Sequence, residues 1–202
     1  MKTVGSTADT YAALDITIDM RYDERMSIKP NSIDDLVCTT FNEDFIDGDG
    51  PYSQLNASDR PRQEWRWQNS LHSIDDHPAI IFSDNGEQQW YAHGTRHRPE
   101  HLGPAWIKTS PSLQLYYAAG ELHRRGGPAM IYPDHEKWYQ CNRLHRDDGP
   151  ASIHTVRQGW SIGKSSPIEW WFNGNRFKDV DDWGKSNPID PEVFTLLKLE
   201  FG

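Results

Sequence analysis

Four of the nine histidines in the sequence occupy the same place in a recurring phrase, and at 145–147 that phrase carries the letters HRD. The same letters mark the catalytic loop of protein kinases, where an aspartate acts as base. A kinase also needs a glycine-rich phosphate loop, a strand lysine and a DFG motif, and the sequence has none of these. The phrase therefore does not indicate phosphoryl transfer. Its histidines are His72, His97, His123 and His145.

A metal site is the second chemistry that repeated histidines could serve. If each copy of the phrase spans two strands, successive histidines lie about 9–10 Å apart, too far for two imidazoles to share one zinc at about 2 Å each. His93, His97 and His101 are close in sequence, but turns separate them. We therefore predict no metal and no cofactor, and a structural role in which each ring packs on an aromatic side chain and hydrogen-bonds the Asp-Asp-Gly turn.

Arginines follow three of these histidines and form a second series at the same interval. A row of guanidinium groups beside aromatic rings could bind a phosphate-bearing ligand or an acidic protein face. Alternatively, each arginine pairs with neighbouring acids such as Asp147 and Asp148, or covers aromatic surface. No Ser-His-Asp set, Cys-His pair or phosphate loop has a recognisable sequence context, and so we predict no catalytic residue. The candidate binding residues are Arg98, Arg124, Arg146, Tyr91, Tyr117, Tyr139 and Trp171.

The elements that position these residues form an internal repeat. The repeat prolines are Pro78, Pro104, Pro128 and Pro150, at intervals of 26, 24 and 22 residues. An aromatic residue stands seven positions before each histidine, and a fifth precedes Phe177, which replaces histidine. These aromatics are Trp65, Trp90, Tyr116, Trp138 and Trp170.

Turn signals divide each unit into antiparallel strands. Residues 92–94, 118–120, 140–142 and 172–174 carry the Gly and Asn that supply positive φ in tight hairpins. The Asp-Asp-Gly-Pro stretch predicts a second turn, in which Gly takes the unusual dihedral and Pro opens the next strand. Ala and Ile then alternate with variable residues. The sequence thus predicts a meander of about ten short strands, with Trp/Tyr and Ala/Ile ladders on one face.

This pattern of aromatic pair, Asn-Gly turn and His-Arg-x-x-Gly-Pro-Ala resembles MORN repeats, and more closely a MORN-like variety found mostly in uncharacterised viral, especially phage, proteins. The resemblance covers about residues 47–178, with units near 47–70, 71–95, 96–121, 122–143 and 144–177. It implies an elongated β-hairpin sheet and an interaction scaffold. Numbered by their histidine, units one to four contain His72, His97, His123 and His145, and unit five contains Phe177. Unit one departs from the pattern with His77 in place of Gly, and the insertion RQGWSIGKSSP precedes the aromatic pair of unit five.

The flanks predict caps for the two sheet edges. Residues 1–46 form a small acidic α+β cap, with a strand at 15–22 and a short helix from the capping-box pattern at 31–41. Residues 179–202 form a helical cap, with Asp190 as N-cap and Pro191 in the first turn. We expect one helix face, made of Val193, Leu196, Leu197 and Phe201, to cover the last hairpin.

Composition limits the partners. The net charge is −9, and residues 1–60, with 12 acids and 5 bases, hold most of it. This opposes non-specific binding to nucleic acid or anionic membrane, although an acidic surface could serve solubility alone, meet a basic partner or imitate DNA. With no signal peptide or membrane span and only Cys38 and Cys141, taken as buried free thiols, we expect a soluble cytoplasmic protein.

Taken together, the sequence predicts a mainly β, elongated hairpin-repeat sheet acting as a non-enzymatic interaction scaffold. The resemblance suggests a phage accessory protein that binds and inhibits a host defence protein. A small-ligand binder that sequesters a nucleotide-like phosphate ligand is the alternative, and a hydrolase built from the 157–167 insertion and the His-rich turns is the third. A homo-oligomer stays open, as do the partner's identity and the exposed face of the sheet.

Overall fold

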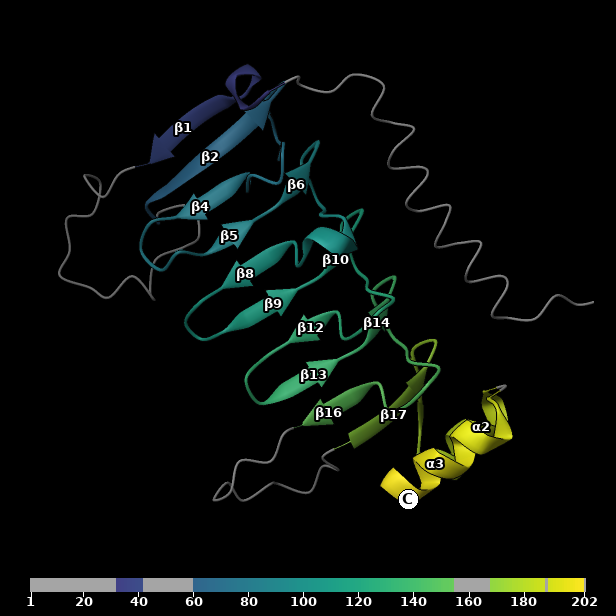
Figure 1. Ribbon diagram of the computed structural model, residues 1–202. Coiled ribbons are helices and arrows are strands. Elements are labelled where there is room, and N and C mark those ends of the chain that lie inside the picture. The colour runs from purple at the N-terminus through teal and green to yellow at the C-terminus, as the bar shows by residue number, and fades with distance from the viewer. Residues whose placement is uncertain (1–31, 42–59, 155–167, 188, 202) are drawn as a thin grey trace, which may run out of the picture.

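One long antiparallel sheet forms the body of the molecule, with its strands lying across the long axis (Figure 1). The computed structural model describes residues 32–41, 60–154, 168–187 and 189–201. Within them the main sheet has twelve strands, ordered β1-β2-β4-β5-β8-β9-β12-β13-β16-β17-β18, with β3 paired to β2. The prediction of a mainly β, antiparallel hairpin sheet with a helical C-terminal end is confirmed.

The strands are short, as the close spacing of the turn signals requires. The main sheet comprises β1 (Val37–Phe41), β2 (Arg62–Trp67), β3 (Ser70–Leu71), β4 (Ile80–Phe82), β5 (Gln88–Gln89), β8 (Trp106–Lys108), β9 (Leu113–Leu115), β12 (Met130–Ile131), β13 (His135–Lys137), β16 (Ser152–His154), β17 (Ile168–Phe172) and β18 (Asn175–Phe177). Three separate hairpins are β6 (Tyr91–Ala92) with β7 (Thr95–Arg96), β10 (Tyr117–Ala118) with β11 (Glu121–Leu122), and β14 (Tyr139–Gln140) with β15 (Arg143–Leu144).

Each inner unit has two tiers, which corrects the prediction of two strands per unit. Two strands pair in the main sheet, and the chain then continues past the repeat aromatic into a separate hairpin, which we call the side hairpin. Side hairpins of neighbouring units are joined by backbone bonds, such as Gly120 N to Arg96 O at 2.9 Å and Gly174 N to Leu144 O at 2.9 Å. The aromatic pair therefore marks the junction between tiers.

Tight turns lie at the tips of the three side hairpins and of the hairpins β2–β3 and β17–β18, and all but the β2–β3 turn are at positions that the sequence predicts. Both central residues of each turn have φ between 47° and 84°, as the two-residue turns that match strand twist require. Gly and Asn adopt such angles at low cost, whereas a larger side chain is strained there. The turn pairs are Gln68/Asn69, His93/Gly94, Ala119/Gly120, Cys141/Asn142 and Asn173/Gly174.

Large and small residues alternate from strand to strand in the buried part of the sheet. Trp65 N donates to Ala79 O, and Trp90 N donates to Ala105 O at 2.8 Å; the next units repeat this bond. All four alanines of this row are completely buried. Each alanine leaves room for the rings on the neighbouring strands, which is the close packing that cores require. This aromatic–alanine row comprises Trp65, Ala79, Trp90, Ala105, Tyr116, Ala129, Trp138, Ala151 and Trp170.

A second row lies two residues along the strands, on the same face. Isoleucine and glutamine alternate from strand to strand between β2 and β12. Beyond β12, Glu136 lies between Ile131 and Ile153, and Ile153 is opposite Ile168. Every member keeps part of its surface exposed. We call it the isoleucine–glutamine row: Gln63, Ile81, Gln88, Ile107, Gln114, Ile131, Glu136, Ile153 and Ile168.

The N-terminal flank contributes an edge strand. Ser32 N donates to Asp35 Oδ2 at 3.2 Å, but the helix predicted from this motif is only one 3-10 turn, η1 (Ile33–Asp35). The β-branched residues Val37, Thr39 and Thr40 then favour extended backbone, and β1 pairs with β2. Cys38, expected to be buried, is exposed in β1. The strand predicted at 15–22 and most of the 1–46 cap lie outside the described residues.

Two helices, α2 (Val180–Ser186) and α3 (Pro191–Phe201), close the C-terminal end. Asp179 accepts from Asp182 N at 2.9 Å, and Asp190 accepts from Glu192 N at 2.8 Å, so an aspartate caps each helix. Trp183 and Leu197 pack with Trp170 of β17 in one core cluster. Among the described residues, no helix is long and apolar enough to cross a membrane.

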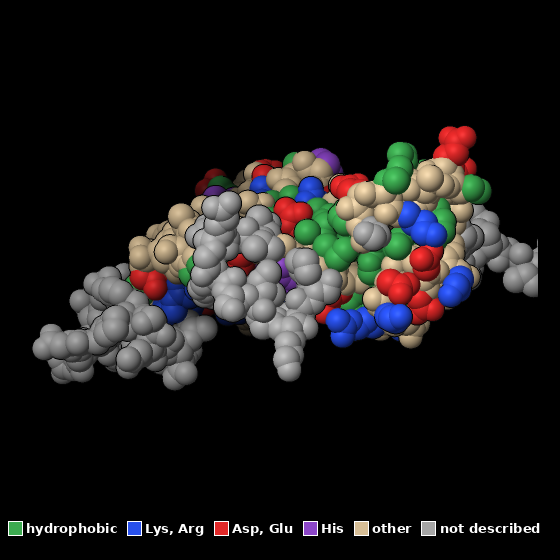
Figure 2. Space-filling view, turned by 90° about the horizontal axis from the view of Figure 1, so that it is seen from below, with side chains coloured by type: hydrophobic (Ala, Val, Ile, Leu, Met, Phe, Trp, Pro, Cys, Tyr) green, Lys and Arg blue, Asp and Glu red, His purple; other side chains and the backbone are tan. Residues whose placement is uncertain are grey.

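The predicted apolar face of α3 is partly wrong. Leu197 and Phe201 pack on the cluster as expected, together with Phe194, because these three lie on one side of the helix. Val193 and Leu196 instead face solvent, and Leu199 is 80% exposed. Figure 2 shows apolar side chains among charged ones at this end of the molecule.

Candidate functional site

Each repeat arginine lies flat over the repeat aromatic of its own unit. The guanidinium carbon is 3.9 Å from the Trp90 ring centre in the case of Arg98, and the two following units repeat this at 3.8 and 4.1 Å. Nη1 of each arginine also donates to the repeat proline's carbonyl, at 2.9, 3.2 and 3.3 Å. The arginine thus covers an aromatic ring and ties the loop after the histidine to the sheet. The stacked pairs are Arg98/Trp90, Arg124/Tyr116 and Arg146/Trp138.

The repeat glycine is needed because it touches this guanidinium. A Cβ placed on Gly127 or Gly149 would lie 3.2 or 3.0 Å from the arginine's Cζ, and one on Gly103 would lie 3.1 Å from Nη1 of Arg98. Of the three, only Gly103 has positive φ, at 123°. The prediction that this glycine serves an unusual dihedral is therefore wrong in units three and four, where it serves a close approach.

In unit one, different residues cover the repeat aromatic and bond the proline carbonyl. It has Ser73 in place of arginine and His77 in place of glycine. The His77 ring packs edge-on against Trp65 with centroids 4.4 Å apart, and its Nδ1 lies 2.7 Å from Pro78 O. Because a carbonyl only accepts, Nδ1 donates this bond. His77 thus does both tasks of the arginine, ring cover and proline bond.

Acidic residues pair with all three repeat arginines. Asp76 of unit one accepts two bonds from Arg98, at 2.7 and 2.8 Å. Glu100 of unit two lies 3.4 Å from Nε of Arg124, and Arg146 pairs with Asp148 of its own loop at 2.6 Å. The structure thus shows the pairing alternative that the sequence left open. Ligand binding by these arginines stays a prediction.

The repeat histidines link successive units. Nδ1 of His97 accepts from Ala119 N at 3.2 Å, in the side-hairpin turn of the next unit, and the other three repeat this pattern. We had expected a bond to the Asp-Asp-Gly turn of the same unit. The acceptor role fixes Nδ1 as unprotonated in this bond. The four bonds are His72 to His93 N, His97 to Ala119 N, His123 to Cys141 N and His145 to Asn173 N.

The second aromatic of each pair lies at the start of the side hairpin. Tyr91 is opposite Arg96, whose guanidinium lies 5.0 Å from the Tyr117 ring centre and 4.5 Å from that of Trp106. Arg96 therefore bridges units two and three, although the sequence analysis did not single it out. All four predicted rings are half-buried, and burial, with a contribution from Glu169, raises the pKa of Tyr139. The rings are Tyr91, Tyr117, Tyr139 and Trp171.

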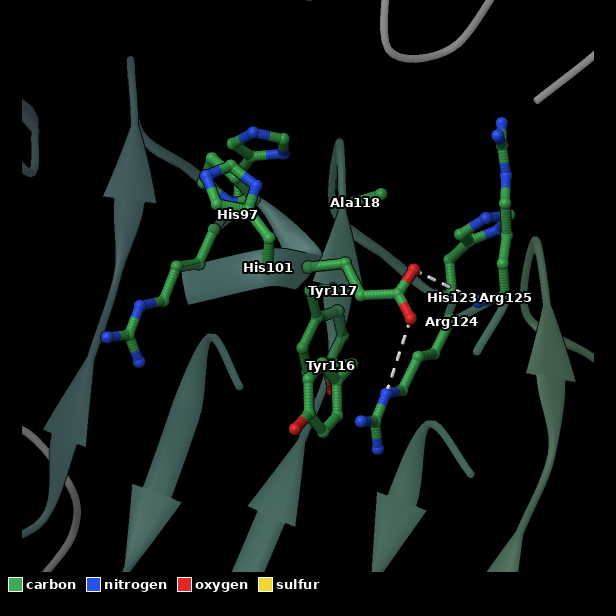
Figure 3. Close-up of a pocket in the computed structure, with 11 residues that line it drawn as sticks. His97, His101, Tyr116, Tyr117, Ala118, His123, Arg124 and Arg125 are labelled. Atoms are coloured by element: carbon green, nitrogen blue, oxygen red, sulfur yellow. Dashed lines mark hydrogen bonds and ion pairs between the residues drawn. The ribbon is translucent and has the colours of Figure 1, made fainter. Parts of the chain in front are cut away.

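A cavity of about 680 Å³ opens between units two and three (Figure 3). It is lined by residues 97–101, 116–118 and 123–125, and so brings together three predicted binding residues, Arg98, Tyr117 and Arg124. Arg146, Tyr91, Tyr139 and Trp171 are not part of it. This size is in the range of small-molecule sites.

Glu100 and Arg125 also line this cavity, and neither was predicted from the sequence. A signal was present, because proline lies seven positions after histidine in unit two and five positions after it in units three and four. The longer loop forms the 3-10 turn η4 (Glu100–Leu102), which brings Glu100 to the following unit. The lining carries three arginines against one glutamate, so it is locally basic in a chain of net charge −9. In the part of the chain that the structure describes, no group of three metal-ligating side chains occurs.

Compared with known proteins, the chain matches no family model, no curated protein and no solved structure. The fold itself is a long antiparallel sheet of hairpin-paired strands, consistent with a repeat sheet. Membership of the MORN-like proteins stays a prediction from the sequence pattern.

Proposed function

We propose that this chain is a non-enzymatic interaction scaffold that binds another protein along the isoleucine–glutamine row. The observation that carries the proposal is the register: nine ladder positions in succession form one continuous, half-exposed strip on one face. Protein interfaces combine apolar contact with side-chain hydrogen bonding in this way. A long, shallow strip suits a macromolecule better than a small ligand, which needs a concave site.

The strip also specifies the partner's geometry. Strands lie about 4.8 Å apart, so isoleucines on alternate strands recur about every 9.6 Å. A partner that presents apolar side chains at that interval would contact Ile81, Ile107, Ile131 and Ile153 in turn. The intervening amides would bond its polar groups. On the resemblance to viral MORN-like proteins, we further propose that the partner is a bacterial host protein with a defence role, which the scaffold inhibits.

A paired set of variants tests the strip. Ile107→Glu with Ile131→Glu places two charges in its centre, and Thr109→Glu with Ser112→Glu adds the same charge at the exposed β8–β9 turn. Affinity capture from bacterial lysate should yield one stoichiometric partner with the wild type and the turn variant. The strip variant should lose it while keeping the wild-type circular dichroism spectrum. Equal capture by all three proteins would rule out the strip as the binding surface.

A further inference from the structure

The repeat arginines differ in how closely a carboxylate pairs with each of them. Arg98 is fully engaged, because Asp76 binds it through two oxygens and its side chain is only 10% exposed. Arg124 is held more loosely. Its Nε lies 3.4 Å from Glu100 Oε1, forms no hydrogen bond and is buried. A buried guanidinium N–H without an acceptor is costly, so this position favours an additional anionic oxygen.

Backbone donors converge on the same point. Gly126 N donates to Glu100 Oε1 at 2.9 Å, and Arg125 N donates to Oε2 at 3.2 Å. Two successive N–H groups beside a guanidinium form an arrangement that binds oxyanions. The chain's own carboxylate therefore already occupies an anion site.

From these contacts we infer that the cavity between units two and three is a binding site for a phosphate monoester, which enters by displacing the Glu100 carboxylate. The phosphate oxygens take the bonds from Arg125 N and Gly126 N and give Arg124 Nε the acceptor that it lacks. Arg125, Tyr117 and His101 also line the cavity, so the bound phosphate carries its attached base or other flat group beside Tyr117 and His101.

Glu100 can be displaced because the phosphate oxygens replace its two backbone hydrogen bonds and its ion pair. Its side chain is 37% exposed and lies on the short turn η4, so it can swing into water without unpacking the core. An exposed ion pair of this kind contributes little to stability. A phosphate dianion in the same place meets Arg124 and Arg125 without the Glu100 carboxylate, while Arg98 stays paired with Asp76. The inference concerns a different surface from the isoleucine–glutamine row and does not depend on it.

The test compares two charge-neutralising variants by calorimetric titration. Glu100→Gln removes the internal carboxylate, and Asp148→Asn makes the same change at the Arg146 pair outside the cavity. Inorganic phosphate and adenosine monophosphate are the probes. Glu100→Gln should bind both at least about tenfold more tightly than the wild type, whereas Asp148→Asn should match the wild type. Tighter binding of the nucleotide than of phosphate assigns a role to the rings; equal binding limits the site to the phosphate group.

Amide NMR of the wild type provides a second readout that needs no variant. Phosphate titration should shift the amide signals of Arg125 and Gly126 before others. Equal affinity gains in the two variants would show a non-specific charge effect and overturn the inference. Shifts confined to other amides, or no binding by Glu100→Gln, would overturn it as well.

Discussion

At the scale of single residues, the units share the same contacts around the repeat aromatic even where their residues differ. A cation stacked on a ring, with one donor to the proline carbonyl, recurs in units two to four, and unit one rebuilds it from an imidazole. The two substitutions of unit one explain each other, because the imidazole occupies the space that arginine fills elsewhere. Sequence alone showed His77 as a departure from the pattern and could not show that it compensates for the missing arginine at Ser73.

A double-mutant cycle in unit one tests this compensation. His77→Gly removes the ring over Trp65 and the donor to Pro78 O, so the free energy of unfolding should fall by about 1–3 kcal/mol. Adding Ser73→Arg should recover part of that loss, although Ser73 Oγ also accepts from Tyr91 N. Urea denaturation of the wild type, both single variants and the double variant measures the coupling. Strictly additive effects would contradict the shared role.

At the scale of the elements, the histidine bonds make each side hairpin dependent on the preceding unit. The tight turns have positive φ, and in four of the five a backbone N–H donates to an imidazole Nδ1. The turns were predictable from Gly and Asn, since the dihedral requirement is local. The two-residue strands of the side hairpins were not, because two residues carry no periodicity. The acceptor for the histidine was also beyond prediction, since it lies in the next unit.

The four histidine bonds should contribute different amounts to the free energy of unfolding. His145 is buried and its Nδ1 is 3.1 Å from Asn173 N, whereas the half-buried His123 is 3.4 Å from Cys141 N. His145→Ala should therefore cost about 1–3 kcal/mol, because it leaves a backbone N–H without its partner, and His123→Ala should cost less. Chemical denaturation of the two variants side by side checks the order. A larger loss for His123→Ala would contradict it.

The C-terminal helices offer a matched pair of leucines. Leu197 is buried among Trp170, Val180 and Trp183, whereas Leu199 is exposed on the same helix. Leu197→Ala should lower the free energy of unfolding by about 2–4 kcal/mol, and Leu199→Ala should change it by less than about 0.5 kcal/mol. Thermal melts of both variants are the measurement. Similar values for both would show that the helices do not cap the sheet through this cluster.

At the scale of the whole molecule, the repeat was predictable and the cavity was not. The spacing of aromatic, histidine and proline predicts which strands are neighbours. Each of these residues recurs once per unit, so equivalent residues lie at the same position along successive strands. The cavity arises from one loop longer than its neighbours, next to a loop with two glycines. The alternation of large and small residues in the aromatic–alanine row was partly visible in the sequence. That each alanine lies between the rings of the two neighbouring strands could be known only from the strand register of the structure.

Acid should weaken the N-terminal end of the sheet. Arg60 donates to Asp84 at 2.8 and 2.9 Å, and this bonding holds the pKa of Asp84 below its ordinary value of 3.8. The folded state thus favours the carboxylate, so the contribution is fully present above pH 3.8 and is lost as the pH falls through the lower folded pKa. Asp84→Asn should lower stability at pH 7 and show a shallower loss below pH 4 in urea titrations. An unchanged acid profile would contradict this.

The orientation of the strands across the long axis has a mechanical consequence. The hydrogen bonds between main-sheet strands run along that axis, so a pull on the two ends of the array loads them one ladder at a time (Figure 1). The strands of such a sheet therefore separate one after another under tension, because the force does not load all hydrogen bonds of a ladder in parallel. A unit of about 24 residues would release roughly 80 Å of chain as it opens. Under tension this molecule should lengthen in regular steps, one unit after another, from whichever end yields first.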